Sequence, residues 1–459
     1  MKKKVGSIIL AGSFLSTTTF AAPVTPESVQ LSVDTMWIMI AAILVFFMHA
    51  GFAMVESGFT RAKNSLNILM KNILTISLGS ILYFLVGYGI MFGNSNGFFG
   101  TSGFALQGVD DIGFFVFQAV FAATCATIIS GAVAERMKLS SYLLLTILMT
   151  GAIYPVVGHW IWGGGWISEL GFVDFAGSTV VHLTGAVGAF IAVLFLGARI
   201  GKYNGKSVNA IPGHNIPLGA LGVFILWFGW FGFNGGSSLA ADPSLIPIVI
   251  STTLLSASGG VVASALYSRI RFKKIDPSIT LNGALGGLVG ITAGTANVSL
   301  FGAIIIGLIA GVILVEGIRF IDVVLRVDDP VGAIAVHGVC GIWGTLAVGL
   351  FDTANGAVYG GGFELLGVQA IGVGAVILWT SAAVGASVFV LKSAGGIRVE
   401  REEELAGLDY AEHGSNAYEF KESLTSSSSK QTDNVNGDLV ERLNQLGSSM
   451  KKPKARKSI

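Results

Sequence analysis

Long apolar runs separated by short polar stretches dominate the chain between residues 34 and 392. Each run is about twenty residues long, the length that an α-helix needs to cross a bilayer. Dividing the pattern at charged and turn-rich stretches predicts eleven spanning helices, at residues 35–56, 71–92, 113–135, 141–161, 177–198, 216–239, 245–267, 280–297, 300–320, 331–350 and 366–391. The pattern therefore indicates an all-α polytopic membrane protein.

Basic residues divide the predicted loops into two classes. The loops Gly93–Ile112, His159–Ala176 and Phe351–Leu365 contain no lysine or arginine. Loops of the other class are basic, through Arg61, Lys63, Arg136, Lys138, Arg199, Lys202, Lys206, Arg269, Arg271, Lys273, Lys274, Arg319 and Arg326. Because cytoplasmic loops are enriched in lysine and arginine, we expect the N-terminus outside and the C-terminus in the cytoplasm of a cell that holds this protein in its inner (plasma) membrane.

Composition agrees with this class and separates the two ends of the chain from its middle. With 52% hydrophobic and 12% charged residues, the chain lies outside the range of water-soluble domains, about a quarter of whose residues are charged. Lys2–Lys4, an apolar stretch and Ala21-Ala22-Pro23 favour a signal peptide over residues 1–21 rather than a further spanning helix. A membrane domain over 34–392 is then followed by an ordered cytoplasmic segment, 393–420, and a polar, disordered tail, 421–459.

One polar pattern occurs twice inside apolar runs. In "DFAGSTVVHLTG" Asp174 precedes His182 by eight residues, and in "DDPVGAIAVHGVCG" Asp329 precedes His337 by eight. The two pairs lie in the fifth and tenth predicted spans, so that spans one to five and six to ten form two repeats. Five crossings in each repeat make the second inverted relative to the first, a design that places a substrate path at the repeat interface near mid-membrane. Both histidines are expected there, with their aspartates at opposite faces.

Ionisable residues inside spans are costly and usually functional. We interpret His49 and His159 as packing residues, whereas the matched spacing favours a shared role for His182 and His337. Two neutral imidazoles offer a donor and an acceptor to a small polar molecule; the alternative use of such a pair is ligation of haem. The two cysteines, Cys125 and Cys340, are expected to be buried packing residues.

Aromatic residues narrow the choice of ligand. Trp162 ends the fourth span in "HWIWGGGW", and Ser237 follows Phe233 by four residues in the sixth. A tryptophan face attracts a cation and a hydroxyl accepts its hydrogen bond; the alternative is an interfacial aromatic belt. Asp174 has two open roles, as the cap of its helix or as a residue that contacts the substrate.

The motifs together resemble the Amt/Mep/Rh family of ammonium transporters, specifically its bacterial Amt branch, from about Asp34 to Phe420. They are "DFAGSTVVHLTGAVGAFIAVLFLGARIGKY", "WFGFNGGS", "LGGLVGITAG" and "VHGVCGIWG", in that order. The resemblance implies a homotrimer with one pore in each subunit, built from eleven helices as two inverted five-helix repeats plus a final long helix. It implies a transport protein without a cofactor rather than an enzyme.

The resemblance also assigns roles to individual residues. Phe121, Trp162 and Ser237 would form an outer ammonium-recruitment site that Asp174 supports, Phe121 and Phe233 would stack as a gate, and His182 with His337 would line the pore. The implied substrates are ammonium, ammonia and methylammonium, with ammonium deprotonated before ammonia is conducted. The segment "GLDYAEHGSNAYEF" resembles the family's cytoplasmic segment, where a PII-type regulatory protein docks. An ammonium sensor of the same fold is the alternative function.

Overall fold

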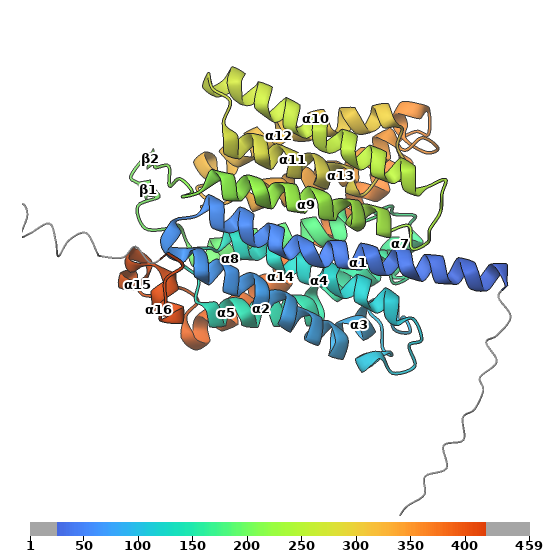
Figure 1. Ribbon diagram of the computed structural model, residues 1–459, viewed down its shortest axis with the longest axis horizontal. Coiled ribbons are helices and arrows are strands. Elements are labelled where there is room, and N and C mark those ends of the chain that lie inside the picture. The colour runs from blue at the N-terminus through green and yellow to red at the C-terminus, as the bar shows by residue number, and fades with distance from the viewer. Residues whose placement is uncertain (1–24, 419–459) are drawn as a thin grey trace, which may run out of the picture.

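The computed structural model describes residues 25–418, so the predicted signal peptide and tail lie outside the described residues. The long helices run side by side in one bundle, with α15, α16 and the β1–β2 hairpin at one end and α7 at the other (Figure 1). We call the end that carries α15 and α16 the C-terminal face. The helices of the first repeat are α1 (Pro26–Phe59), α2 (Ser65–Leu82), α3 (Tyr88–Phe92), α4 (Ile112–Ala132), α5 (Leu139–Leu148), α6 (Tyr154–Ile161), α7 (Trp166–Glu169) and α8 (Thr184–Leu196).

The second half repeats this series of helices. It contains α9 (Ile216–Gly236), α10 (Ile246–Phe272), α11 (Pro277–Thr292), α12 (Leu300–Arg319) and α13 (Cys340–Phe351), followed by α14 (Glu364–Gly395), α15 (Arg401–Ala406) and α16 (Leu408–His413). One-turn π-helical segments extend or join these helices at Tyr83–Gly87, Met149–Ile153, Ser178–Leu183, Phe320–Val324 and Ile334–Val339. Between α8 and α9 the strands β1 (Tyr203–Asn204) and β2 (Ser207–Val208) pair antiparallel.

Ten helices within residues 25–418 are long and apolar enough to cross a membrane. The predicted span 280–297 corresponds to α11, which has 16 residues and ends at Thr292. The first helix begins at Pro26 rather than at residue 35, because Thr25 caps it with a capping box and Pro26 occupies its first turn. Pro is suited to the first turn of a helix, where its missing N–H costs nothing.

Glycines set the distance between the central helices. A Cβ atom on Gly58 of α1 would lie 2.4 Å from the backbone nitrogen of Gly219 in α9. A Cβ on Gly307 of α12 would lie 2.0 Å from the carbonyl oxygen of Ser256 in α10. Small residues allow such close backbone contact between membrane helices. The helices of the α1–α9 pair and of the α10–α12 pair are therefore packed so closely that their backbones are in contact.

The two aspartates of the repeated motif cap their helices in the same way. The Asp174 carboxylate accepts hydrogen bonds from the N–H groups of Gly177, Thr179 and Val180, and that of Asp329 accepts from Val331, Gly332 and Ile334. Gly177 and Gly332, each three residues after its aspartate, have φ values of +110° and +80°. Glycine adopts such values without steric cost. The repeat therefore encodes a capped helix start as well as a histidine.

Residues from both ends of the chain meet at the C-terminal face. The Lys63 ammonium donates to the carbonyl oxygens of Glu404 and Leu405, and the Asp409 carboxylate accepts from the N–H of Asn67 in the first turn of α2. Arg398 forms an ion pair with Glu404, whose carboxylate also accepts from the N–H of Ile200. Hydrogen bonds between charged side chains and backbone groups thus hold the segment after α14 against the bundle.

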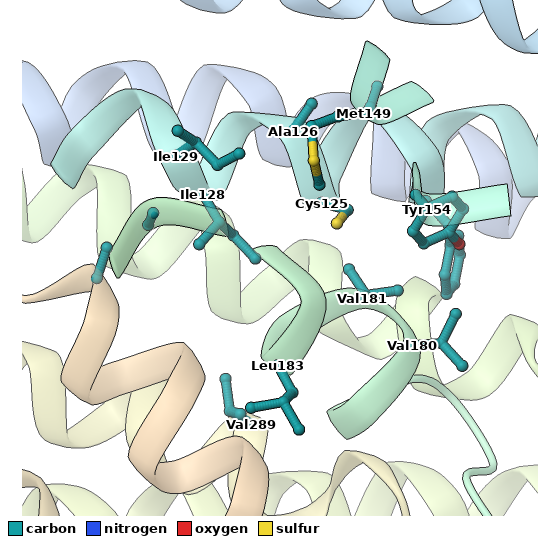
Figure 2. Packing of buried hydrophobic residues seen from close by; sticks show 14 of the residues in the cluster. Cys125, Ala126, Ile128, Ile129, Met149, Tyr154, Val180, Val181, Leu183 and Val289 are labelled. Carbon is teal, nitrogen blue, oxygen red and sulfur yellow. The ribbon is translucent and has the colours of Figure 1, made fainter. Parts of the chain in front are cut away.

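Figure 2 shows the apolar layer between α4 and the start of α8, where Cys125, Met149 and Val181 lie close together. Both cysteines are buried and neither forms a disulfide, as expected for packing residues. Cys340 lies at the first residue of α13 on the other repeat. Neither side chain contributes to the polar features described below.

Candidate functional site

The repeated histidines meet in the interior of the bundle. Nδ1 of His182 lies 3.2 Å from Nδ1 of His337, and their rings are stacked with centroids 5.1 Å apart. His182 is fully buried and His337 is 3% exposed. One ring nitrogen of such a pair must donate and the other accept. The geometry therefore holds a single hydrogen between two imidazoles, as the matched spacing predicts.

The backbone explains why both side chains point inward. His182 lies in the π-helical turn Ser178–Leu183 and His337 in the π-helical turn Ile334–Val339. A π-helical turn inserts one extra residue per turn and is frequent at functional sites. The aspartate cap fixes the start of each turn, so cap, turn and histidine form one local unit in both repeats.

An aromatic column continues from the histidines toward the face opposite the C-terminal face. His182 stacks on Trp230 at 4.9 Å and on Phe233 at 5.4 Å between ring centroids. Phe233 in turn stacks on Phe121, with centroids 4.0 Å apart and ring planes 22° apart. Both phenylalanines are at most 1% exposed. Two stacked rings therefore separate the histidines from the space beyond them.

A cavity of about 280 Å³ lies beyond the stacked phenylalanines. Its lining includes Phe117, Phe121, Trp162 and Ser237, which brings the predicted recruitment residues to one place. The Trp162 indole donates to the carbonyl oxygen of Asp174, and the Ser237 hydroxyl donates to that of Phe233. These bonds leave the indole face and the lone pairs of the serine oxygen able to attract a cation, and the amide oxygen of Gln118, which also lines the cavity, has no hydrogen-bond partner among the described residues.

Asp174 is linked to this cavity only indirectly, through the hydrogen bond from Trp162 to its carbonyl oxygen. Its side chain is 4% exposed and faces the N–H groups that it caps, while its carbonyl oxygen positions Trp162. Burial raises the pKa of the Asp174 carboxyl to about 6, although backbone hydrogen bonds act in the opposite direction. Of its two predicted roles, the structure shows the helix cap.

A second, much smaller cavity lies on the other side of the histidines. It has a volume of about 20 Å³, and its lining includes His337, Phe52, Glu56 and Asn282. This volume is enough for one water molecule. The Phe52 ring lies 6.1 Å from the His337 ring, centroid to centroid. The outer cavity, the phenylalanine pair, the histidine pair and this inner cavity thus follow one another through the bundle.

The C-terminal face carries a buried ion-pair network below the inner cavity. Arg199 holds the carboxylate of Asp328 by two side-chain hydrogen bonds of 2.8 Å and also approaches Glu135. Burial alone would raise the pKa of Asp328, but the hydrogen bonds and charges of Arg199 and Arg136 lower it well below its ordinary value. Asp328 precedes the helix-capping Asp329, so the network anchors the start of the helix that carries His337.

The remaining intramembrane histidines lie away from the column. His159 bonds to the carbonyl oxygen of Met91 and to the Ser95 hydroxyl, which fits the packing role expected for it. His49 bonds to the carbonyl oxygen of Phe46 through Nδ1. Sequence reasoning did not select Trp230, Phe52 or Glu56, although Trp230 opens the motif "WFGFNGGS" and Glu56 is an acid within a predicted span.

Haem ligation, the alternative use of two histidines, does not fit this geometry. The nitrogens that face each other are only 3.2 Å apart, and the rings are stacked face to face. A haem iron would have to lie between two such nitrogens, each directed at the metal. The approach of the two rings leaves no space for the haem plane.

Known proteins match the part of the chain that contains these site residues. The profile of the Ammonium Transporter Family matches residues 36–418. A putative ammonium transporter of Synechocystis is 44% identical over 84% of this chain and 89% of its own length, and ammonium transporter Amt2 of Archaeoglobus fulgidus is 43% identical over 85% and 89%. A solved structure described as a sensor Amt protein superposes with a TM-score of 0.81, at 40% identity, over 84% of this chain and 100% of that one.

Proposed function

The chain belongs to the ammonium transporter family, and from this premise we propose that it transports ammonium across the cell membrane. The observation that carries the proposal is the column of cavity, stacked phenylalanines and paired histidines through one subunit. Its order matches what a small cation needs: polar attraction first, then a barrier, then an exchangeable hydrogen bond. Ammonium, and methylammonium as its analogue, is the substrate.

Recruitment takes place in the outer cavity. Ammonium has the charge of potassium and a similar size, so a simple cation site would discriminate poorly between them. A hydroxyl such as that of Ser237 accepts a hydrogen bond that only ammonium can donate, and the Trp162 face adds a cation–π contact. Phe121 completes this site and forms its floor.

Deprotonation precedes passage through the stacked phenylalanines. Bringing a bare cation into an apolar, buried passage costs several kcal/mol or more. Loss of a proton to water or to a polar group in the cavity converts ammonium to ammonia, which passes Phe121 and Phe233 without that cost. His182 and His337 then offer one donor and one acceptor to ammonia and a route for the proton.

The test is an ammonium-evoked current, or uptake of labelled methylammonium, in proteoliposomes of the purified protein. Wild type should respond and His182→Ala and His337→Ala should lose ammonium selectivity. Wild-type liposomes with correctly folded protein and no response would exclude transport. If ammonium binds but no flux occurs, the protein is a sensor, the function given for the solved structure at 40% identity.

Three further properties accompany this function as proposals. The protein spans the plasma membrane eleven times, with the C-terminal face in the cytoplasm because the basic loops gather there. It forms a homotrimer with one pore per subunit, which mass measurement in detergent tests. A PII-type protein docks at the C-terminal face, and the absence of binding in every nucleotide state of the cognate PII protein would exclude this.

A further inference from the structure

Glu56 is a carboxylic acid buried near the C-terminal end of α1 that the mechanism above does not use. Its side chain is 2% exposed. Oε2 accepts a 2.8 Å hydrogen bond from the Ser130 hydroxyl of α4 and a 3.3 Å bond from the Asn72 amide of α2. Both bonds fall on the same oxygen, which leaves Oε1 without a hydrogen bond among residues 25–418. A buried acid in a membrane helix indicates a functional site and requires a partner.

Lys71 supplies the neighbouring positive charge. Its side chain is fully buried on α2, one residue before Asn72, and within the described part of the chain its ammonium nitrogen has no hydrogen-bond partner. The nitrogen lies 5.3 Å from the centre of the Tyr142 ring, whose hydroxyl is bonded to Thr75. Isolated buried charges are very costly. Glu56 and Lys71 therefore compensate each other without forming a direct ion pair.

Glu56 shares the inner cavity with His337. Both residues line the space of about 20 Å³, which is large enough for one water molecule. Gly131 keeps the space open, because a Cβ at this position would lie 2.6 Å from the Val331 side chain and 3.4 Å from Cγ of Glu56. The Asn282 amide also lines the cavity but donates to the carbonyl oxygen of Val331. Glu56 is consequently the proton acceptor that faces the histidine pair across one water site.

We propose that Glu56 receives the proton that ammonium loses and passes it from the histidine pair toward the cytoplasm. The proposal rests on the proposed transport function. An imidazolium at His337 gives its proton to the cavity water, which at the same time gives one of its own to the Glu56 carboxylate. The histidine returns to its neutral form, and Glu56 later releases the proton to water at the C-terminal face. Ammonia and one proton leave for each ammonium that arrives, and no electron is transferred.

The hydrogen bonds alone do not require a charge at residue 56, because a glutamine oxygen accepts the same bonds from Ser130 and Asn72. A glutamine would, however, leave the buried Lys71 ammonium without a compensating charge. Burial favours the protonated carboxyl and the positive charge of Lys71 favours the ionised carboxylate, so that both protonation states are accessible to Glu56. The Glu56 carboxyl is therefore suited to reversible protonation beside a space that is large enough for one water molecule.

The test compares Glu56→Gln, Glu56→Asp and Glu316→Gln with wild type in ammonium-evoked current across proteoliposomes. Glu316 on α12 is partly exposed, pairs with Arg271 and Arg319, and is not among the residues that line either cavity, so it serves as the matched control. We expect Glu56→Gln to lower the current at least tenfold in protein that still folds, Glu56→Asp to retain part of it, and the control to equal wild type. An unchanged current in folded Glu56→Gln protein overturns the proposal.

Infrared difference spectroscopy on the wild type keeps the proposal testable if Glu56→Gln does not fold. Addition of ammonium should produce a protonated-carboxyl band that shifts when glutamate, but not aspartate, carries carbon-13. The absence of this band overturns the proposal, as does a band that shifts only with labelled aspartate. Failure of the transport function has a different signature, because wild type itself would then give no current.

Discussion

His182 and His337 face each other with their Nδ1 atoms 3.2 Å apart, so that one hydrogen serves two rings. Replacement of either by alanine removes this hydrogen bond and leaves the other ring unpaired beside a void. We predict that His182→Ala and His337→Ala each lose discrimination between ammonium and potassium by at least tenfold. Currents evoked by each cation in proteoliposomes measure this ratio. If both variants kept wild-type selectivity, the pair would be a packing feature.

Ser237→Ala should weaken ammonium recruitment. The Ser237 oxygen lines the outer cavity, and its hydroxyl hydrogen is already donated to the Phe233 carbonyl. A hydrogen bond to a charged group contributes about 1.5–3 kcal/mol, which corresponds to an increase of tenfold or more in the half-saturating ammonium concentration. Ser258→Ala is the control, because that hydroxyl bonds to Leu254 on α10. Equal half-saturation in the two variants would remove Ser237 from the recruitment site.

Gly177→Ala should both destabilise the protein and reduce transport. Gly177 has φ of +110°, and an added Cβ would lie 2.8 Å from Val181. Forcing alanine into this conformation costs about 1–3 kcal/mol and displaces the turn that carries His182. Gly367→Ala on α14 provides the comparison, since a Cβ there meets nothing within 4 Å. Thermal unfolding and ammonium current measure the two effects; a Gly177→Ala protein as stable and active as Gly367→Ala would contradict the role of the cap.

Asp328→Asn should change the acid stability of the C-terminal face. Its pKa in the folded protein is below the unfolded value of about 4, so its contribution is complete above that pH and is lost as pH falls toward the folded pKa. Breaking a buried ion pair costs about 3–5 kcal/mol. We expect a lower unfolding temperature at pH 7 and a weaker loss of stability between pH 5 and pH 3, roughly the range given by this linkage.

Glu402→Gln is the comparison for this measurement, because Glu402 is exposed on α15. Its unfolding temperature should follow that of wild type at every pH. A pH profile of Asp328→Asn that parallels wild type below pH 5 would mean that Asp328 does not titrate with unfolding, contrary to the linkage.

The sequence was most informative where it repeats itself. The equal spacing of Asp174–His182 and Asp329–His337 predicted two histidines that meet, and the structure brings them together. The first of these stretches leaves the role of Asp174 ambiguous, because a cap and a substrate contact require the same residue type. The hydrogen bonds from backbone N–H groups show that Asp174 caps its helix. They depend on a glycine with positive φ, and in the sequence this glycine is visible only as the third residue after each aspartate.

Other parts of the site have no signal in a single sequence. Trp230 is one of several aromatics in its span, and its stacking on His182 depends on the packing of α9 against the start of α8. The apolar pattern places Lys71 at the edge of the predicted span 71–92, because a charge normally marks the edge of a span. The helix begins at Ser65, six residues earlier, so Lys71 lies almost two turns inside it and needs Glu56 from another helix.

The bond between Asp409 and Asn67 has a consequence for the order in which the protein is completed. Asn67 lies in the first turn of α2, whose starting residue Asn64 provides no side-chain cap. The carboxylate that satisfies this turn is synthesised 342 residues later. During synthesis α2 is therefore made long before the carboxylate that satisfies its first turn, and this turn is completed only once the segment after α14 has been made and has folded back onto the bundle.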